Sequence, residues 1–226
     1  MTRKLWILVA VAVVALAFST PAKADPVTLG FTCITNNLGS GPPTCSDIAA
    51  QLSVTIASAG TAGSGNALVS FTFNNAGLLA SSITDIYFDD GTLLGIASIT
   101  DSGSGVAFSQ GCSPGSLPGA GNSWTTSFCA DSDPPTQPKG VNPSEWVTIT
   151  FELLPGKSFT DVVSAINLGS ATGGLVIGIH VQGLANDQSE SMINTPPTVI
   201  PEPGTLALFG TGLIGLAGVI RRRMSK

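Results

Sequence analysis

Hydrophobic and polar residues alternate in four separate runs through the middle of the chain. These runs cover residues 52–56, 69–73, 147–153 and 175–181. A period of two is typical of half-buried β-strands, because successive side chains of a strand point to opposite faces. Three further apolar runs are less regular and lie at residues 27–34, 83–88 and 93–99. Turn-forming residues separate the runs, so the pattern predicts a domain of short strands.

A single segment, residues 161–167, has the pattern of a helix. Thr160 precedes it as the expected N-cap, and Gly169 follows its end. No repeat of fixed period is present, which argues against a solenoid or a propeller. Seven or eight short strands with one helix predict an all-β fold over residues 25–185, an antiparallel β-sandwich that is jelly-roll-like.

Residues 1–24 have the pattern of a signal peptide. Arg3 and Lys4 precede an apolar segment at 5–18, and Ala22 and Ala24 are the small residues that signal peptidase recognises. We therefore expect export through the inner membrane, with cleavage before Asp25.

The other end combines a rigid turn, an apolar segment and a basic cluster. Two prolines disfavour helix at 201–203, and residues 205–220 carry no charge. As a helix this segment spans roughly 24 Å, against about 30 Å for the hydrocarbon core of a bilayer. The basic cluster contains Arg221, Arg222 and Arg223. Because positive flanks stay cytoplasmic, we expect a transmembrane helix that stops transfer here and leaves the preceding chain in the periplasm.

These three features, in this order, resemble the PEP-CTERM sorting signal of Gram-negative bacteria, a tail also named the ice-binding protein C-terminal domain. The resemblance covers residues 201–226. It implies that exosortase, a membrane-embedded cysteine transpeptidase, recognises Pro201, Glu202 and Pro203 and cleaves near them. It also implies transfer to the cell surface or the exopolysaccharide matrix. The second name of the tail is no evidence for ice binding.

A weaker resemblance lies inside the exported part. Residues 141–146 and 178–183, with 189–191, resemble segments of the β-sandwich ectodomain of many PEP-CTERM proteins. This resemblance implies the sandwich fold and no particular activity.

Two segments lack a strand pattern. Residues 112–143 are rich in proline and glycine, which predicts a long loop over one end or edge of the sandwich. Residues 186–200 are polar and then proline-rich, which predicts a tether between the domain and the membrane.

The cysteines Cys33, Cys45, Cys112 and Cys129 all lie in the exported part. An even number in an oxidising compartment predicts two disulfides. Of the three possible pairings, Cys33–Cys45 with Cys112–Cys129 closes the shortest loops, and the sequence leaves the choice open. The spacings do not fit the CxxC motifs of zinc or redox sites.

Basic residues are scarce between the two targeting segments. The formal net charge is −5, and only Lys139 and Lys157 of the nine basic residues lie in the exported part. Since phosphate groups would find almost no positive partners there, we expect no nucleic acid partner.

Candidate catalytic residues are equally few. His180 is the single histidine, and no Gly-x-Ser-x-Gly motif supplies a nucleophile. We expect His180 and Gln182 to hold Ser189 or Glu190 in a structural role, with no cofactor. The acidic stretches 89–91 and 131–133 carry oxygen ligands for calcium but lack EF-hand spacing, so we expect no metal site.

The sequence thus predicts a non-enzymatic protein of the cell envelope or extracellular matrix. A carbohydrate-binding module at a loop end of the sandwich is the alternative, with or without calcium, and Trp124 or Trp146 could stack on sugar rings. A polysaccharide hydrolase with paired carboxylates is a third, less favoured hypothesis.

Overall fold

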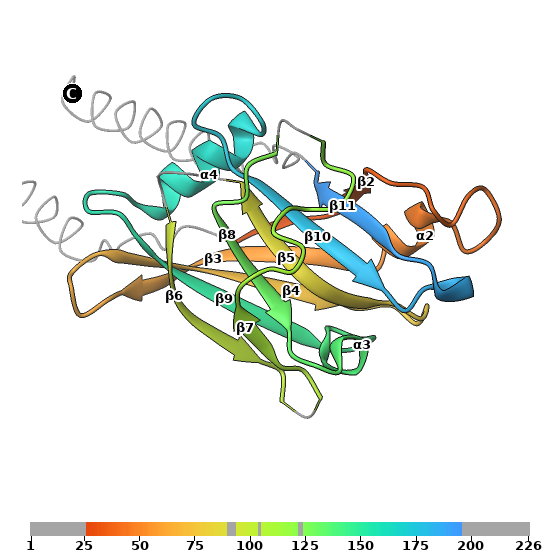
Figure 1. The fold of residues 1–226 in the computed structure, drawn as a ribbon. Coiled ribbons are helices and arrows are strands. Elements are labelled where there is room, and N and C mark those ends of the chain that lie inside the picture. Colours follow the sequence, from red (N-terminus) through yellow and green to blue (C-terminus); the bar gives the residue numbers. More distant parts are fainter. Residues whose placement is uncertain (1–25, 90–93, 104, 122–123, 196–226) are drawn as a thin grey trace, which may run out of the picture.

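The computed structural model describes residues 26–89, 94–103, 105–121 and 124–195. In this part of the chain two antiparallel sheets pack against each other, and the predicted β-sandwich is confirmed (Figure 1). The sheets have five and six strands, rather than the eight strands of a jelly roll. The broader prediction, an antiparallel sandwich, is therefore the one that the structure supports.

The five-stranded sheet shows why the sequence alternates. Its order is β1 (Val27–Leu29), β3 (Leu52–Thr61), β4 (Ala67–Asn75), β9 (Trp146–Leu153) and β6 (Leu94–Asp101). Along β9, the buried Val147, Ile149 and Phe151 alternate with the partly exposed Thr148 and Thr150. One face of this sheet therefore packs in the core while the other meets solvent.

The six-stranded sheet is covered on both faces at its centre. Its order is β2 (Phe31–Cys33), β11 (Glu190–Asn194), β10 (Val176–Gln182), β5 (Ser82–Asp89), β8 (Phe128–Ser132) and β7 (Phe108–Gln110). Every residue of β5 from Ser82 to Phe88 is buried. This continuous burial explains why β5 lacks the regular alternation of β9.

Phenylalanine rings join the two sheets. Phe88 of β5 lies with its ring centroid 4.8 Å from Phe151 of β9 and 5.2 Å from Phe71 of β4, both in edge-to-face contacts. All three rings are fully buried. Such pairs add to the free energy gained from burying the rings, so this cluster forms the centre of the core.

Within the described ranges, four short helical elements connect the strands: α2 (Cys45–Ala49), α3 (Thr136–Lys139), α4 (Phe159–Leu168) and the 3-10 turn η1 (Ala185–Asp187). The predicted helix corresponds to α4, but its N-cap is Ser158 and not Thr160. The Ser158 backbone N–H and hydroxyl both donate to Asp161, at 2.8 and 2.6 Å. The Asp161 backbone N–H donates back to the Ser158 carbonyl at 3.1 Å, and this cap moves the helix start two residues earlier. Gly169 ends the helix with a φ of 58°, as expected.

Two predictions about irregular segments are wrong. The stretch 112–143 is not a single loop, because it contains β8 and α3. The tether predicted at 186–200 is not a tether up to Asn194, because β11 pairs with β10 on one side and with β2 on the other. The domain boundary predicted at residue 185 therefore lies too early, and the sandwich includes β11.

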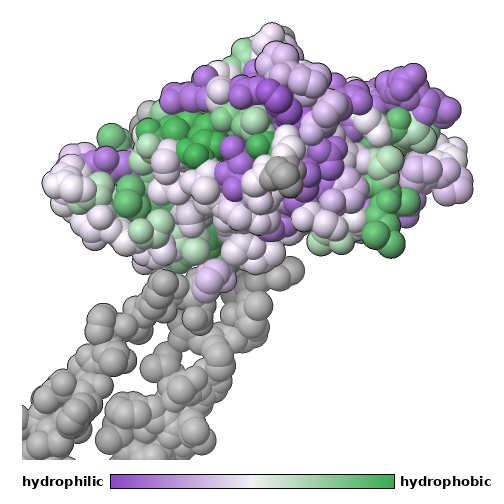
Figure 2. Space-filling model, turned by 90° about the horizontal axis from the view of Figure 1, so that it is seen from below, coloured by the Kyte–Doolittle hydropathy of each residue, from purple (hydrophilic) through white to green (hydrophobic). Residues whose placement is uncertain are grey.

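On the face of the molecule seen in Figure 2, hydrophobic residues do not form one broad exposed surface. Figure 2 shows them in separate patches among polar residues. Among the described residues, the large hydrophobic side chains that are exposed are Leu78, Leu79, Trp146, Leu154 and Leu168.

Candidate functional site

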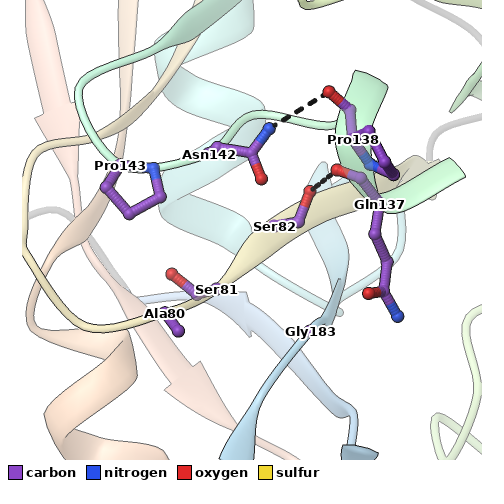
Figure 3. Close-up of a pocket in the computed structure, with 8 residues that line it drawn as sticks. All are labelled: Ala80, Ser81, Ser82, Gln137, Pro138, Asn142, Pro143 and Gly183. Atoms are coloured by element: carbon purple, nitrogen blue, oxygen red, sulfur yellow. Dashed lines mark hydrogen bonds between the residues drawn. The ribbon is translucent and has the colours of Figure 1, made fainter.

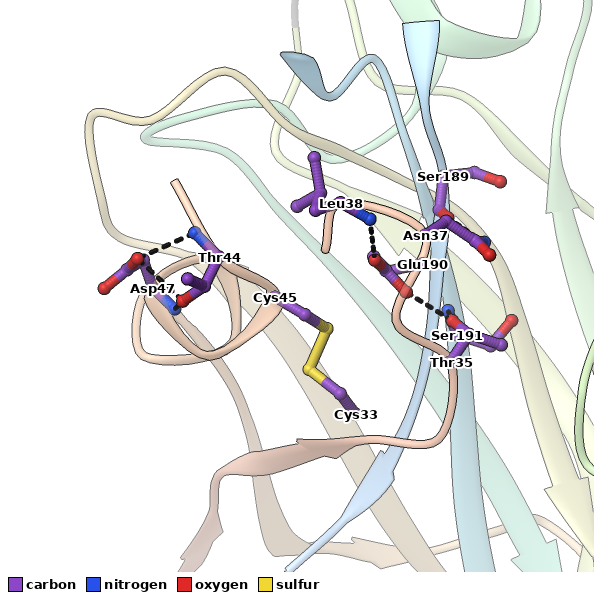
Figure 4. Close-up of a disulfide and its surroundings, with 10 residues drawn as sticks. All are labelled: Cys33, Thr35, Asn37, Leu38, Thr44, Cys45, Asp47, Ser189, Glu190 and Ser191. Atoms are coloured by element: carbon purple, nitrogen blue, oxygen red, sulfur yellow. Dashed lines mark hydrogen bonds between the residues drawn. A yellow bond between two sulfur atoms is a disulfide. The ribbon is translucent and has the colours of Figure 1, made fainter. Parts of the chain in front are cut away.

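The strand that leads toward the C-terminal segment is anchored by a buried carboxylate. Glu190 of β11 is 0% exposed. It accepts hydrogen bonds from the Leu38 backbone N–H at 2.7 Å and from the Thr35 hydroxyl (Figure 4). The Ser191 N–H in turn donates to the Thr35 hydroxyl oxygen at 2.8 Å. The loop after β2 is therefore bound to β11 by side chains as well as by strand pairing.

The prediction that His180 and Gln182 hold Ser189 or Glu190 is wrong. Glu190 is held by Thr35 and Leu38, and the Ser189 carbonyl accepts a hydrogen bond from the Asn37 amide at 2.6 Å. The loop 34–38 is distant from β11 in sequence, so no local pattern pointed to it.

A disulfide stabilises the same corner. Cys33 of β2 is bonded to Cys45 of α2 (Figure 4). Thr44 caps α2, and its backbone N–H and hydroxyl both donate to Asp47, which lowers the pKa of that exposed carboxyl. The second disulfide joins Cys112 to Cys129. The pairing is thus the one that closes the two shortest loops.

A row of polar residues crosses the outer face of the six-stranded sheet. In register, Ser191, His180, Asp85, Asp131 and Ser109 lie side by side on β11, β10, β5, β8 and β7. The His180 Nδ1 atom lies 3.5 Å from Asp85 Oδ2, which is longer than a hydrogen bond. Residues from five strands therefore form one row on this face, although they are spread over more than 80 positions of the sequence.

The disulfide-closed loop 112–129 covers this face. Tyr87 of β5 is fully buried beneath it and donates its hydroxyl hydrogen to the Pro114 carbonyl at 3.1 Å. Gly178 of β10 lies directly under Leu117 and Trp124, and a Cβ at this glycine would be 2.5 Å from Leu117. Leu117 is buried as well. A small apolar cluster on the outer face thus holds the loop in place.

Burial and like charge change the acidity of this cluster. Burial, together with the neighbouring charge of Asp85, raises the pKa of Asp131 to about 6, although the Ser113 N–H donates to its carboxylate at 2.6 Å and acts in the opposite direction. Burial and the charges of Asp85 and Asp131 raise the pKa of Tyr87 as well. Asp131 Oδ1 and His180 Nδ1 have no hydrogen-bond partner among the described residues.

The acidic stretches do not form a metal centre in the described part of the chain. No group of three His, Cys, Asp or Glu side chains is arranged there to hold an ion. Asp131 accepts from the Ser113 N–H and Asp133 from the Ser109 hydroxyl, so both carboxylates have partners within the protein. Asp90 and Gly91 lie outside the described residues.

The predicted sorting residues all lie outside the described ranges as well. These are the signal peptidase site at Ala22 and Ala24, the motif Pro201, Glu202 and Pro203, and the basic cluster Arg221, Arg222 and Arg223. The same holds for the membrane span predicted at 205–220. Within the residues that are described, no helix is both long and apolar enough to cross a membrane.

Comparison with known proteins places the family resemblance at the end of the chain. No curated protein and no solved structure matches the chain significantly. Residues 199–223 match the family model described as the PEP-CTERM protein-sorting motif. This match begins five positions after Asn194, the last residue of β11. The chain is therefore a PEP-CTERM sorting domain-containing protein.

Proposed function

We propose that this protein is exported and then sorted by exosortase to the cell surface or the extracellular polysaccharide matrix. The match to the PEP-CTERM sorting motif at 199–223 carries the proposal. The position of the motif supports it, because only residues 195–198 separate β11 from the matched segment. Exosortase would receive a folded sandwich with the motif close behind it, and the two disulfides are consistent with an oxidising compartment.

We further propose that the sandwich itself is not an enzyme. The His180 ring lies beside Asp85, and no hydroxyl or thiol group in the described ranges is hydrogen-bonded to that ring. A histidine without a nucleophile lacks the arrangement that acyl transfer requires. The carboxyls Asp85 and Asp131 are neighbours across β5 and β8, as the acid pairs of glycosidases are neighbours, but the 112–129 loop reaches Asp131, because the Ser113 backbone N–H donates to its carboxylate.

The sorting proposal predicts that the motif and the basic cluster are both needed for processing. Glu202→Ala, or deletion of Arg221 to Arg223, should leave a longer precursor in the inner membrane, because exosortase recognition or membrane orientation is lost. Intact mass and cell fractionation in the native host measure both effects. Asp187→Asn, at an exposed position just before β11, is the control. Identical mature mass and location in all variants would refute the proposal.

The proposal that the sandwich is not an enzyme is tested separately. The purified protein should release no reducing sugar from polysaccharides of the host. Depolymerisation that disappears in Asp131→Asn, with the fold intact by circular dichroism, would show instead that the acid pair is catalytic.

A further inference from the structure

A surface cavity at one end of the sandwich collects residues from four distant parts of the chain (Figure 3). Its volume is about 460 Å³, within the range of small-molecule sites. The lining residues are Ala80, Ser81, Ser82, Gln137, Pro138, Asn142, Pro143 and Gly183. They come from the β4–β5 connection with the first residue of β5, from α3, from the segment before β9 and from the residue after β10.

Asn142 presents its side-chain oxygen in a fixed orientation. Its Nδ2 group donates to the Gly140 carbonyl and to Glu145 Oε2, each at 3.0 Å. The Asn142 backbone N–H also donates to Glu145, at 2.8 Å. Because the amide nitrogen must face these acceptors, Oδ1 faces the other way, and Figure 3 shows it turned toward Ser82. Oδ1 has no partner in the described part of the chain.

Gln137 supplies a second free polar group. It is exposed on α3, and no hydrogen bond of its side-chain amide is found among the described residues. The amide lies against Gly183, where a Cβ would be 3.4 Å from Gln137 Oε1. Its backbone carbonyl is occupied by the Ser82 hydroxyl at 2.8 Å. The NH2 group of Gln137 as donor and the side-chain oxygens of Gln137 and Asn142 as acceptors are therefore available to a ligand.

A buried network makes the walls rigid. The Asn75 amide, which is 1% exposed, donates to the Ser81 hydroxyl at 3.0 Å and to the Val141 carbonyl at 3.2 Å. The Gln51 amide also donates to the Ser81 hydroxyl, at 2.6 Å. Gly140 lets α3 approach β5, since a Cβ there would be 2.2 Å from the Ser82 hydroxyl. The cavity is therefore preformed, which lowers the entropy lost on binding.

We propose that this cavity binds a neutral sugar unit of an oligosaccharide or polysaccharide. No charged side chain lines it, so an ionic ligand would lack a counter-charge. The free amide groups suit hydroxyls that both donate and accept, and Pro138, Pro143 and Ala80 contribute apolar surface to the lining for the C–H groups of a sugar ring. The inference does not depend on sorting by exosortase, because it concerns only the folded domain.

The test uses the full-length protein in a zwitterionic detergent without a sugar headgroup. It is applied to an array of neutral gluco-, galacto-, manno- and xylo-oligosaccharides beside oligosaccharides of uronic acids, and isothermal titration follows with the best neutral ligand. Gln137→Ala should weaken binding about tenfold, as expected for one lost hydrogen bond. Ala80→Tyr should abolish binding by filling the cavity. Adding a chelator should change nothing, because no carboxylate lines the site.

Gln110→Ala, at an exposed glutamine on β7 away from the cavity, is the matched control and should bind like the wild type. Thermal melting establishes that each variant is folded. The proposal is overturned if the protein binds no neutral oligosaccharide on the array, or if it binds only the oligosaccharides of uronic acids. If both cavity variants bind the neutral oligosaccharide as well as the wild type does, the ligand binds elsewhere, and the proposal is overturned too.

Discussion

At the scale of single residues, the polar row on the outer face contains a carboxyl group whose acidity depends on the fold. Asp131 lies beside Asp85 across β5 and β8, and its pKa is raised to about 6 by burial and by that neighbour. An unfolded aspartate has a pKa of about 3.9. A pKa that is higher in the folded state stabilises the fold fully below about pH 4, and this stabilisation is lost as the pH rises through about 6.

Asp131→Asn should therefore stabilise the protein at neutral pH. The amide keeps an oxygen for the Ser113 N–H and removes the charge that faces Asp85. Because Asp131 is only partly buried and solvent screens its charge, we expect a gain of about 1 kcal/mol or less. That corresponds to a melting temperature higher by at most about 2–4 °C.

Thermal melts at about pH 7.5 and about pH 4 measure this effect. The advantage of Asp131→Asn should vanish at the lower pH, where the wild-type carboxyl is protonated. A gain of equal size at both pH values would mean that packing, and not charge, separates the two proteins.

At the scale of elements, the loop 112–129 acts as a cover over the six-stranded sheet. The Cys112–Cys129 disulfide closes it, and Leu117 and Trp124 hold it over Gly178. Tyr87 lies underneath and is the single tyrosine of the chain. Its pKa is raised mainly by burial, so it reports whether the cover is closed.

Replacing both Cys112 and Cys129 by serine should loosen this cover. We expect a loss of roughly 2–4 kcal/mol in the free energy of unfolding, as for other loops of this size. The pKa of Tyr87 should fall toward about 10 as its hydroxyl becomes hydrated. Tyrosinate absorbance during an alkaline titration and denaturant unfolding give the two quantities.

The double variant of Cys33 and Cys45 provides the comparison for the cover. It opens the other disulfide, between β2 and α2, and should lower stability while leaving the tyrosine titration unchanged. Equal tyrosine shifts in both double variants would count against a local cover.

At the scale of the whole molecule, β11 completes the sandwich immediately before the sorting motif. It lies between β10 and β2, and its Met192 is fully buried in the core. Cleavage after Thr195 would therefore leave both sheets complete. This arrangement fits the proposed processing by exosortase, which would then release an intact domain.

Two truncated chains test this arrangement. A chain from Asp25 to Thr195 should unfold in one cooperative transition, whereas a chain from Asp25 to Ala185 should not fold. The shorter chain loses the pairing partner of both β10 and β2 and leaves their backbone groups without hydrogen bonds. Circular dichroism and thermal melting compare them. A cooperative transition in the shorter chain would mean that the segment after Ala185 is not needed for folding, as the predicted tether implied.

Local pattern predicted much of this fold but missed specific strands. β3, β4 and β9 alternate because one of their faces meets solvent. β11 does not alternate, since four of its five residues are buried. Its polar residues are of the types found in a linker. The Glu190 contacts with Thr35 and Leu38 join residues more than 150 positions apart, so no spacing in the sequence revealed them.

The sequence by itself determined the half-buried strands and the sorting motif at 199–223, because each is written in consecutive residues, and the even set of cysteines, because it needs only a count. Only the tertiary structure decided that β11 belongs to the sheet, that Asp85, Asp131 and His180 lie in one row, and that Gln137 and Asn142 share a cavity with Gly183. The physical reason is register. Which side chains become neighbours depends on how distant strands pair and on what covers them, and a local pattern of hydrophobic and polar residues does not contain that information.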